Sequence, residues 1–185
     1  MKKHLPKILF IIFVLILSLI YVVYIQINGG ATYIESENRL SEITESLGNI
    51  GGFLLTLIYA RTILKLIIVN KKAWQRLEPF ELDPTEIKTW LQKILYYLNK
   101  THIYVGTLAI ITIFMHCYLT GSYSDNLLLK LVLVLIAWQG IFGAFLYFKF
   151  TPTTIKRKSY LFHAQFITGI LILILATFGH LLIGD

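Results

Sequence analysis

The sequence predicts an all-α, polytopic membrane protein: a helical bundle with five transmembrane helices. Of its 185 residues, 56% are hydrophobic and only 15% are charged. A water-soluble domain of this length cannot bury so much apolar surface. Five stretches are also long and apolar enough to cross about 30 Å of hydrocarbon as helices, and the whole chain, 1–185, is interpreted as one membrane domain. The predicted spans cover approximately residues 7–27, 48–70, 101–120, 127–150 and 160–183.

The first span follows the basic segment "MKKHLPK". Its apolar run from Ile8 to Ile27 is longer than the apolar region of a usual signal peptide, and "INGGATY" is a poor cleavage site. We therefore expect an uncleaved helix, with a signal peptide as the alternative.

Basic residues are distributed unevenly between the two sides of this arrangement, and by the positive-inside rule they predict a cytoplasmic N-terminus and an exterior C-terminus. The outer side carries only Arg39 and Lys130 among several acids. The inner side carries thirteen basic residues: Lys2, Lys3, Lys7, Lys71, Lys72, Arg76, Lys88, Lys93, Lys100, Lys149, Lys156, Arg157 and Lys158. This asymmetry accounts for the net charge of +7 without a nucleic-acid partner, because basic residues are typical of the inner side of a membrane protein. The sequence therefore predicts a multi-pass protein of the cell (cytoplasmic) membrane, in contact with lipid.

The long inner connection predicts a separate amphipathic helix at about 84–99. Asp83 suits the N-cap, Pro84 the first turn and Glu86 a capping box. Apolar residues then recur at helical spacing: Ile87, Trp90, Leu91, Ile94 and Leu98. We expect this helix to lie in the inner membrane interface, the alternative being a docking helix for a partner protein.

Four of the five histidines lie in the predicted third and fifth spans. His102 and His116 are 14 positions apart, so they point the same way within about 40° and lie roughly 21 Å apart along the axis. His163 and His180 occupy the fifth span, which runs in the same direction as the third. The sequence therefore predicts two pairs at two depths, His102 with His163 near the inner face and His116 with His180 nearer the outer face.

Facing neutral imidazoles in an apolar setting are the axial ligands that a low-spin b-type haem needs. The alternative for each histidine alone is a hydrogen-bonded packing residue. A non-haem metal transporter would usually add carboxylates or thiolates, and the third and fifth spans contain no acid. A c-type haem is excluded because the chain has no Cys-x-x-Cys-His motif.

At "HIYVGTLAIITIFMH" and "HAQFITGILILILATFGH" the chain resembles the transmembrane di-haem b-type cytochromes, and it is most similar to the ferric reductase-like transmembrane domain family. The resemblance covers residues 101–183, and the first two spans match only in number. It implies two haem b groups with bis-histidine ligation, and electron transfer across the membrane. The four implied ligands are His102, His163, His116 and His180.

Two features depart from this family. His163 and His180 are 17 positions apart, about 100° off a common face; tilt, a local bulge or flexibility near Gly179 could absorb the difference. The sequence also shows no flavin or nicotinamide module and no Gly-x-Gly-x-x-Gly. The electron donor is therefore expected to be a separate protein or a membrane quinol, and a quinone is a further candidate cofactor.

Two more residues are candidates for cofactor binding. Arg61 lies inside the second span, where a charge is costly unless paired, and an inner haem propionate would be its partner. A backbone carbonyl or a lipid phosphate is the alternative. Gly106 lies one turn after His102, where a missing side chain would let a porphyrin approach, or simply let helices pack.

These features predict an electron-transfer subunit of a larger redox complex or quinol-linked chain, rather than a complete enzyme. The alternatives are a stand-alone transmembrane reductase of an external acceptor, and a haem-free membrane scaffold or transporter subunit.

Overall fold

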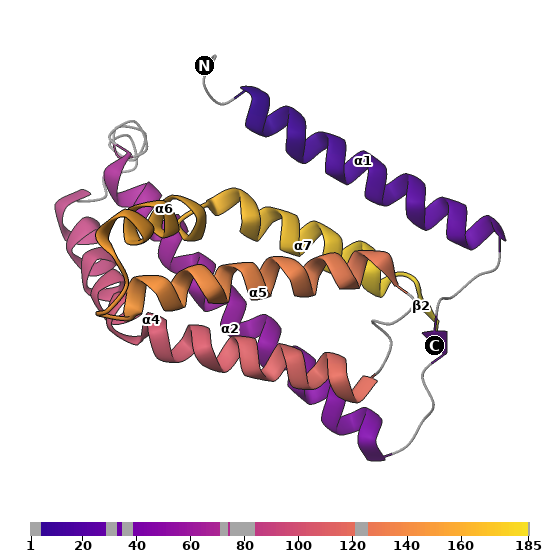
Figure 1. The fold of residues 1–185 in the computed structure, drawn as a ribbon. Coiled ribbons are helices and arrows are strands. Elements are labelled where there is room, and N and C mark those ends of the chain that lie inside the picture. The colour runs from indigo at the N-terminus through magenta and orange to yellow at the C-terminus, as the bar shows by residue number, and fades with distance from the viewer. Residues whose placement is uncertain are drawn as a thin grey trace.

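The computed structural model describes residues 5–28, 33–34, 39–70, 74, 84–120 and 126–184. The structure is all-α apart from one short pair of strands (Figure 1). Its helices are α1 (Leu5–Asn28), α2 (Arg39–Val69), α4 (Pro84–Thr120), α5 (Leu127–Tyr147), α6 (Thr153–His163) and α7 (Phe166–His180). The strands β1 (Tyr33–Ile34) and β2 (Ile183–Gly184) pair in parallel, which joins the segment after α1 to the segment after α7.

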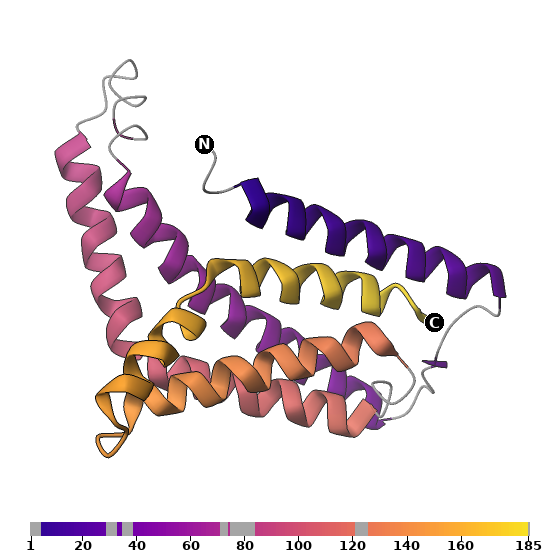
Figure 2. The same ribbon diagram turned by 45° about the horizontal axis from the view of Figure 1, so that its top comes forward.

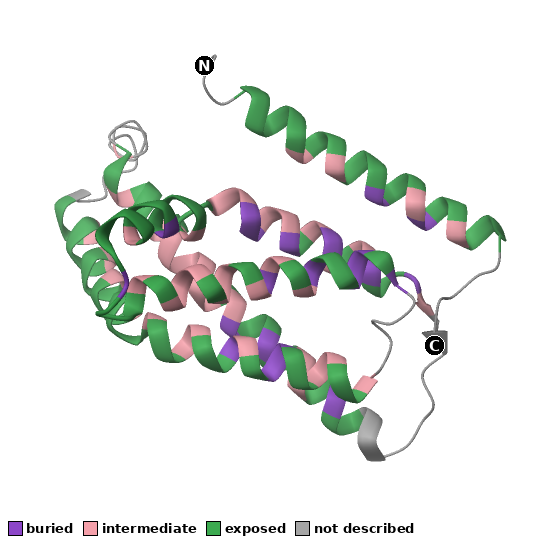
Figure 3. Cartoon of the chain, in the orientation of Figure 1, coloured by how far each residue is buried: buried purple, intermediate pink, exposed green. Residues whose placement is uncertain are grey.

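Four helices in the described part of the chain are long and apolar enough to cross a membrane: α1, α2, α4 and α5. The pair α6 and α7 provides a fifth span if the two are counted together, since they meet at a bend of 48°. Many large apolar side chains are exposed on these helices, above all on α1 (Figure 3). Lipid chains are the environment in which such a surface is stable, so the fold indicates a multi-pass membrane protein.

Successive long helices run in alternating directions, which places the N-terminus and the C-terminus at opposite ends of the bundle (Figures 1 and 2). α4 and the α6–α7 pair consequently run in the same direction, which is required for His102 to lie level with His163 and His116 level with His180.

The helices pack as two groups. α2 lies against α4 along much of its length, and α5 lies against α6 and α7, with α1 outside α7. The two groups meet mainly where α4 approaches α5, with a smaller contact between α2 and α7. The buried apolar core lies chiefly between α5 and α7, where its members are Leu128, Val132, Ile136, Ile172, Leu175 and Leu182. Val22 of α1 and Ile113 of α4 complete it.

α4 joins two elements that the sequence predicts as separate. The interfacial helix expected at 84–99 and the span expected at 101–120 are one continuous helix, Pro84–Thr120, so the predicted boundary is wrong. The physical reason is that Asn99, Lys100 and Thr101 include neither Gly nor Pro, and nothing interrupts the backbone hydrogen bonds. Figure 2 shows that α4 bends instead of breaking: its first part is inclined to the second part, which lies along the other helices of the bundle. The predicted N-cap, Asp83, lies outside the described residues.

The fifth span differs in the opposite way, because it is broken where a continuous helix at 160–183 is expected. α6 begins at Thr153 and ends at His163, and α7 starts at Phe166. Gln165 has extended backbone angles, φ −86° and ψ 112°, which interrupt the helix. The break therefore falls directly after the first histidine of this span.

Candidate functional site

The inner histidine pair joins α4 to the end of α6. The ring centroids of His102 and His163 are 5.9 Å apart, and their planes meet at 69°. The expected pairing of these two rings is confirmed.

The outer pair joins the far part of α4 to the end of α7. The ring centroids of His116 and His180 are 6.3 Å apart, and the planes are nearly parallel, at 14°. This pairing is also confirmed, so the structure brings all four predicted histidines together as two pairs at two levels of the bundle.

The break between α6 and α7 explains how residues 17 positions apart face the same neighbour. In one continuous helix His163 and His180 would point about 100° apart. Because Ala164 and Gln165 leave the helix, α7 starts with a new rotation about its axis and turns His180 toward α4. Of the alternatives that the sequence leaves open, the break takes the place of flexibility near Gly179, which is packed in α7: a Cβ on it would lie 2.6 Å from Leu129 Cδ2.

Three of the four imidazoles donate Nδ1–H to backbone carbonyls. His116 Nδ1 lies 2.7 Å from the Thr44 oxygen, His163 Nδ1 lies 3.0 Å from the Gln139 oxygen, and His180 Nδ1 lies 2.8 Å from the Ala176 oxygen. A carbonyl only accepts hydrogen bonds, so Nδ1 must carry the proton in each ring. In the neutral imidazole Nε2 then keeps a free lone pair, which is the form that binds a metal.

His102 is different, because its buried Nδ1 has no hydrogen-bond partner among the described residues. A histidine kept in a membrane helix only for packing would be expected to satisfy such an atom. The unpaired nitrogen thus argues against the packing alternative at this position.

The ring separations of both pairs match those of two imidazoles that bind one metal from opposite sides. Iron–nitrogen bonds of about 2 Å, with about 1.1 Å from each nitrogen to its ring centre, put the two centroids about 6 Å apart. The observed centroid separations are 5.9 and 6.3 Å. In the described residues no group of three or more His, Cys, Asp or Glu side chains could hold a metal ion. Each pair offers two nitrogen donors, the number that a porphyrin leaves to the protein.

Arg61 lies beside the inner pair. Its Nε donates a hydrogen bond of 2.5 Å to Asn99 Oδ1, and Asn99 lies one turn before His102 on α4. The sequence did not single out Asn99, although a polar amide facing an intramembrane arginine is a natural partner. The structure therefore shows one partner for Arg61 and places its positive charge next to the inner histidines.

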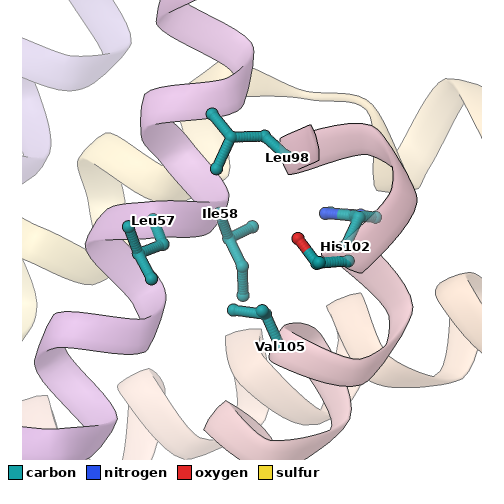
Figure 4. Close-up of a pocket in the computed structure, with 6 residues that line it drawn as sticks. Leu57, Ile58, Leu98, His102 and Val105 are labelled. Atoms are coloured by element: carbon teal, nitrogen blue, oxygen red, sulfur yellow. The ribbon is translucent and has the colours of Figure 1, made fainter. Parts of the chain in front are cut away.

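A small hollow lies on the α2 side of His102 (Figure 4). Leu57 and Ile58 face Leu98 and His102 across it, and one imidazole nitrogen is directed into it. Gly106 also faces α2, where an added Cβ would meet only Ile58 Cδ1, at 3.9 Å. Gly106 thus leaves space at the contact between α2 and α4, and a Cβ there would not reach His163 or His180.

Asn126 holds α5 and α7 together at the end of the bundle that carries His116 and His180, and it was not recognised from sequence. It is fully buried, its side-chain oxygen accepts the backbone N–H groups of Leu128 and Leu129, and its amide donates to the Gly179 oxygen at 2.8 Å. The signal was present in "DNLLLK", since an Asn directly before an apolar run is a common N-cap. Its second bond, to the residue before His180, required the fold.

Comparisons of the chain with protein-family models, curated proteins and solved structures gave no match. The function proposed below accordingly rests on the geometry of the chain itself.

Proposed function

We propose that this chain is a membrane-embedded di-haem cytochrome b that carries electrons across the bilayer, similar to the transmembrane di-haem b-type cytochromes. The observation that carries the proposal is the presence of two facing histidine pairs at two depths, each with a ring separation that suits bis-histidine ligation. A packing role for the histidines does not require such pairs to recur at a second level.

The inner site is held by His102 and His163, and the outer site by His116 and His180. Haem iron, when bound, alternates between its ferric and ferrous states and so handles one electron at a time. The carbonyls of Thr44, Gln139 and Ala176 fix Nδ1–H and leave Nε2 free to bind. The apolar helices exclude water and lower the local dielectric, and nearby charge then tunes each site strongly.

Arg61 tunes the inner site in this proposal. A cation beside the ligands favours the more electron-rich state, and an inner haem propionate is a further partner for the guanidinium besides Asn99. Between the two sites, α4 is helical from His102 to His116, a rise of roughly 21 Å.

The proposed orientation is N-terminus inside and C-terminus outside, in the cell membrane, with Arg61 and the inner pair on the cytoplasmic side. Donor and acceptor would be separate proteins, with a membrane quinol as the alternative donor. We assign the chain the role of an electron-transfer subunit of a larger redox complex. A fusion of alkaline phosphatase after Asp185 should be active, and a fluorescent-protein fusion at the same place dark. The reverse result would overturn the orientation.

The deciding experiment is a haem count on the purified chain. A dithionite-reduced minus oxidised spectrum with a pyridine haemochrome assay should give two haems b per chain. H163A and H180A should each lower the count to one, by removing the inner and the outer site respectively.

A haem-free wild-type chain would refute the function and favour a scaffold or transporter subunit. Two haems in wild type and in both variants would show that haem binds elsewhere. Reduction of a soluble acceptor by the isolated chain with a quinol donor would instead favour a stand-alone reductase.

A further inference from the structure

Two glycines lie against histidine rings in the same way. On α2, a Cβ added to Gly48 would lie 2.9 Å from His116 Cε1 and 3.0 Å from Nδ1. On α5, a Cβ added to Gly143 would lie 3.0 Å from His163 Cε1 and 3.4 Å from Nδ1. In each case the close neighbour is the ring, so a side chain there would have to displace an imidazole.

The hydrogen bonds of these rings repeat the same spacing. His116 donates to the carbonyl of Thr44, four residues before Gly48, and His163 donates to the carbonyl of Gln139, four residues before Gly143. Residues four apart lie on one face of a helix, one turn above the other. The bare surface at the glycine and the carbonyl acceptor thus belong to one face, and we call each such pair of residues a glycine notch.

From this repetition we infer that Gly48 and Gly143 are positioning residues, one for each proposed haem site. The inference rests on the proposed function and deepens it. In each notch the missing side chain lets the ring approach the helix closely enough for Nδ1–H to reach the carbonyl. This fixes the tautomer and the plane of the ring, and Nε2 is left for the metal.

Only one ring of each pair is held in a notch, and the other is freer. His102 lies beside a hollow with its Nδ1 unpaired, and His180 is exposed, bonded only to Ala176 within its own helix. Each site therefore has a fixed imidazole, held by a neighbouring helix, and an adjustable one. The notches lie on α2 and α5, two helices that carry no histidine ligand themselves.

The test replaces each notch glycine with alanine in the full-length, haem-loaded protein. Outer-shell partners of metal-binding histidines typically contribute about 10- to 100-fold to metal affinity. G48A should therefore bind haem at the outer site 10- to 100-fold more weakly, and G143A should do the same at the inner site. At saturating haem the weakened hydrogen bond makes the ligand less basic, so the midpoint potential of the affected site should rise.

Electron paramagnetic resonance distinguishes the two sites in the same sample. Nearly parallel imidazole planes act mainly on one iron d orbital and separate it in energy from its partner. Nearly perpendicular planes act on both orbitals alike and leave them close in energy, and this near-degeneracy gives a larger g anisotropy. The outer planes meet at 14° and the inner planes at 69°. The inner centre should therefore have the larger maximum g value, and H163A and H180A provide the assignment.

The chain offers matched controls on the same two helices. A Cβ at Gly52 of α2 meets nothing within 4 Å. A Cβ at Gly140 of α5 would lie 2.9 Å from Ile110 Cδ1, the end of a flexible side chain that can move aside, and it meets no histidine. G52A and G140A should leave both centres unchanged. In G48A and G143A the unaffected centre reports that the protein has folded.

The outcomes are distinguishable. A wild-type chain without haem refutes the proposed function itself. The wild type could bind two haems while G48A matches G52A, and G143A matches G140A, in haem affinity and midpoint potential. That result would refute the positioning role of the two glycines and leave the proposed function standing. Loss of both centres in either notch variant also refutes that role, because the proposed effect is local to one site.

Discussion

Replacing Asn126 with alanine tests how the outer end of the bundle is held, independently of any cofactor. The substitution removes an N-cap from α5 and a buried hydrogen bond to the Gly179 carbonyl of α7. Loss of a cap costs about 1 kcal/mol, and loss of an interhelical hydrogen bond in a membrane protein costs about 0.6 kcal/mol on average. Because Asn126 is fully buried, water does not replace either bond.

The expected loss of stability is therefore about 1.6 kcal/mol, which corresponds to a fall in Tm of roughly 3–6 °C for a chain of this size. The assay is thermal unfolding in detergent, followed by far-ultraviolet circular dichroism. N126S keeps an oxygen that can cap Leu128 and Leu129, but its side chain is too short to reach Gly179. We expect N126S to recover the capping part of the loss and to unfold between N126A and wild type.

A fall in Tm of less than about 1 °C for N126A would refute the reasoning, since both bonds would then contribute little. Equal Tm values for N126S and N126A would show that the cap contributes nothing.

Three further predictions concern other parts of the molecule. G169A should destabilise the chain by about 1–3 kcal/mol in the same assay, because the new Cβ would lie 2.2 Å from Tyr59 Cε1, whereas G52A should not. R61Q should lower the inner midpoint potential by about 60 mV in a redox titration, a tenfold change in the one-electron equilibrium, and leave the outer one unchanged. Deletion of Ala164 should shorten the break between α6 and α7, change the rotation of α7 about its axis and abolish only the outer haem in the haemochrome assay; two retained haems would contradict the role of the break.

The histidine pairs could be predicted because they depend on simple quantities. Helix periodicity, the odd numbers of the two spans and the depth of each residue were enough to pair His102 with His163 and His116 with His180. The apolar runs likewise located the spans, since hydrocarbon leaves a chain few alternatives to a helix.

The breaks between helices could not be predicted, because they depend on tertiary packing. Neither Gly nor Pro marks the end of α6 at "FHAQF", yet the helix breaks there, whereas Pro84–Thr120 continues past the expected boundary. The carbonyls that hold the rings were also hidden, since every residue has a carbonyl. Sequence alone does not distinguish Gly48 and Gly143 from ordinary small-residue contacts between helices, whereas the structure places an imidazole against each.

The division of the bundle into two helix groups has a consequence for the life of the protein in the cell. α2 and α4 form one half, α5 to α7 form the other, and each histidine pair takes one ring from each half. A molecule that binds both rings of a pair fastens the halves together, and at a thousand times its Kd it adds about 4 kcal/mol to the stability of the folded state. With haem as that molecule, as proposed above, iron and porphyrin supply would govern how long the chain survives membrane proteolysis, and its abundance would follow that supply even at constant synthesis.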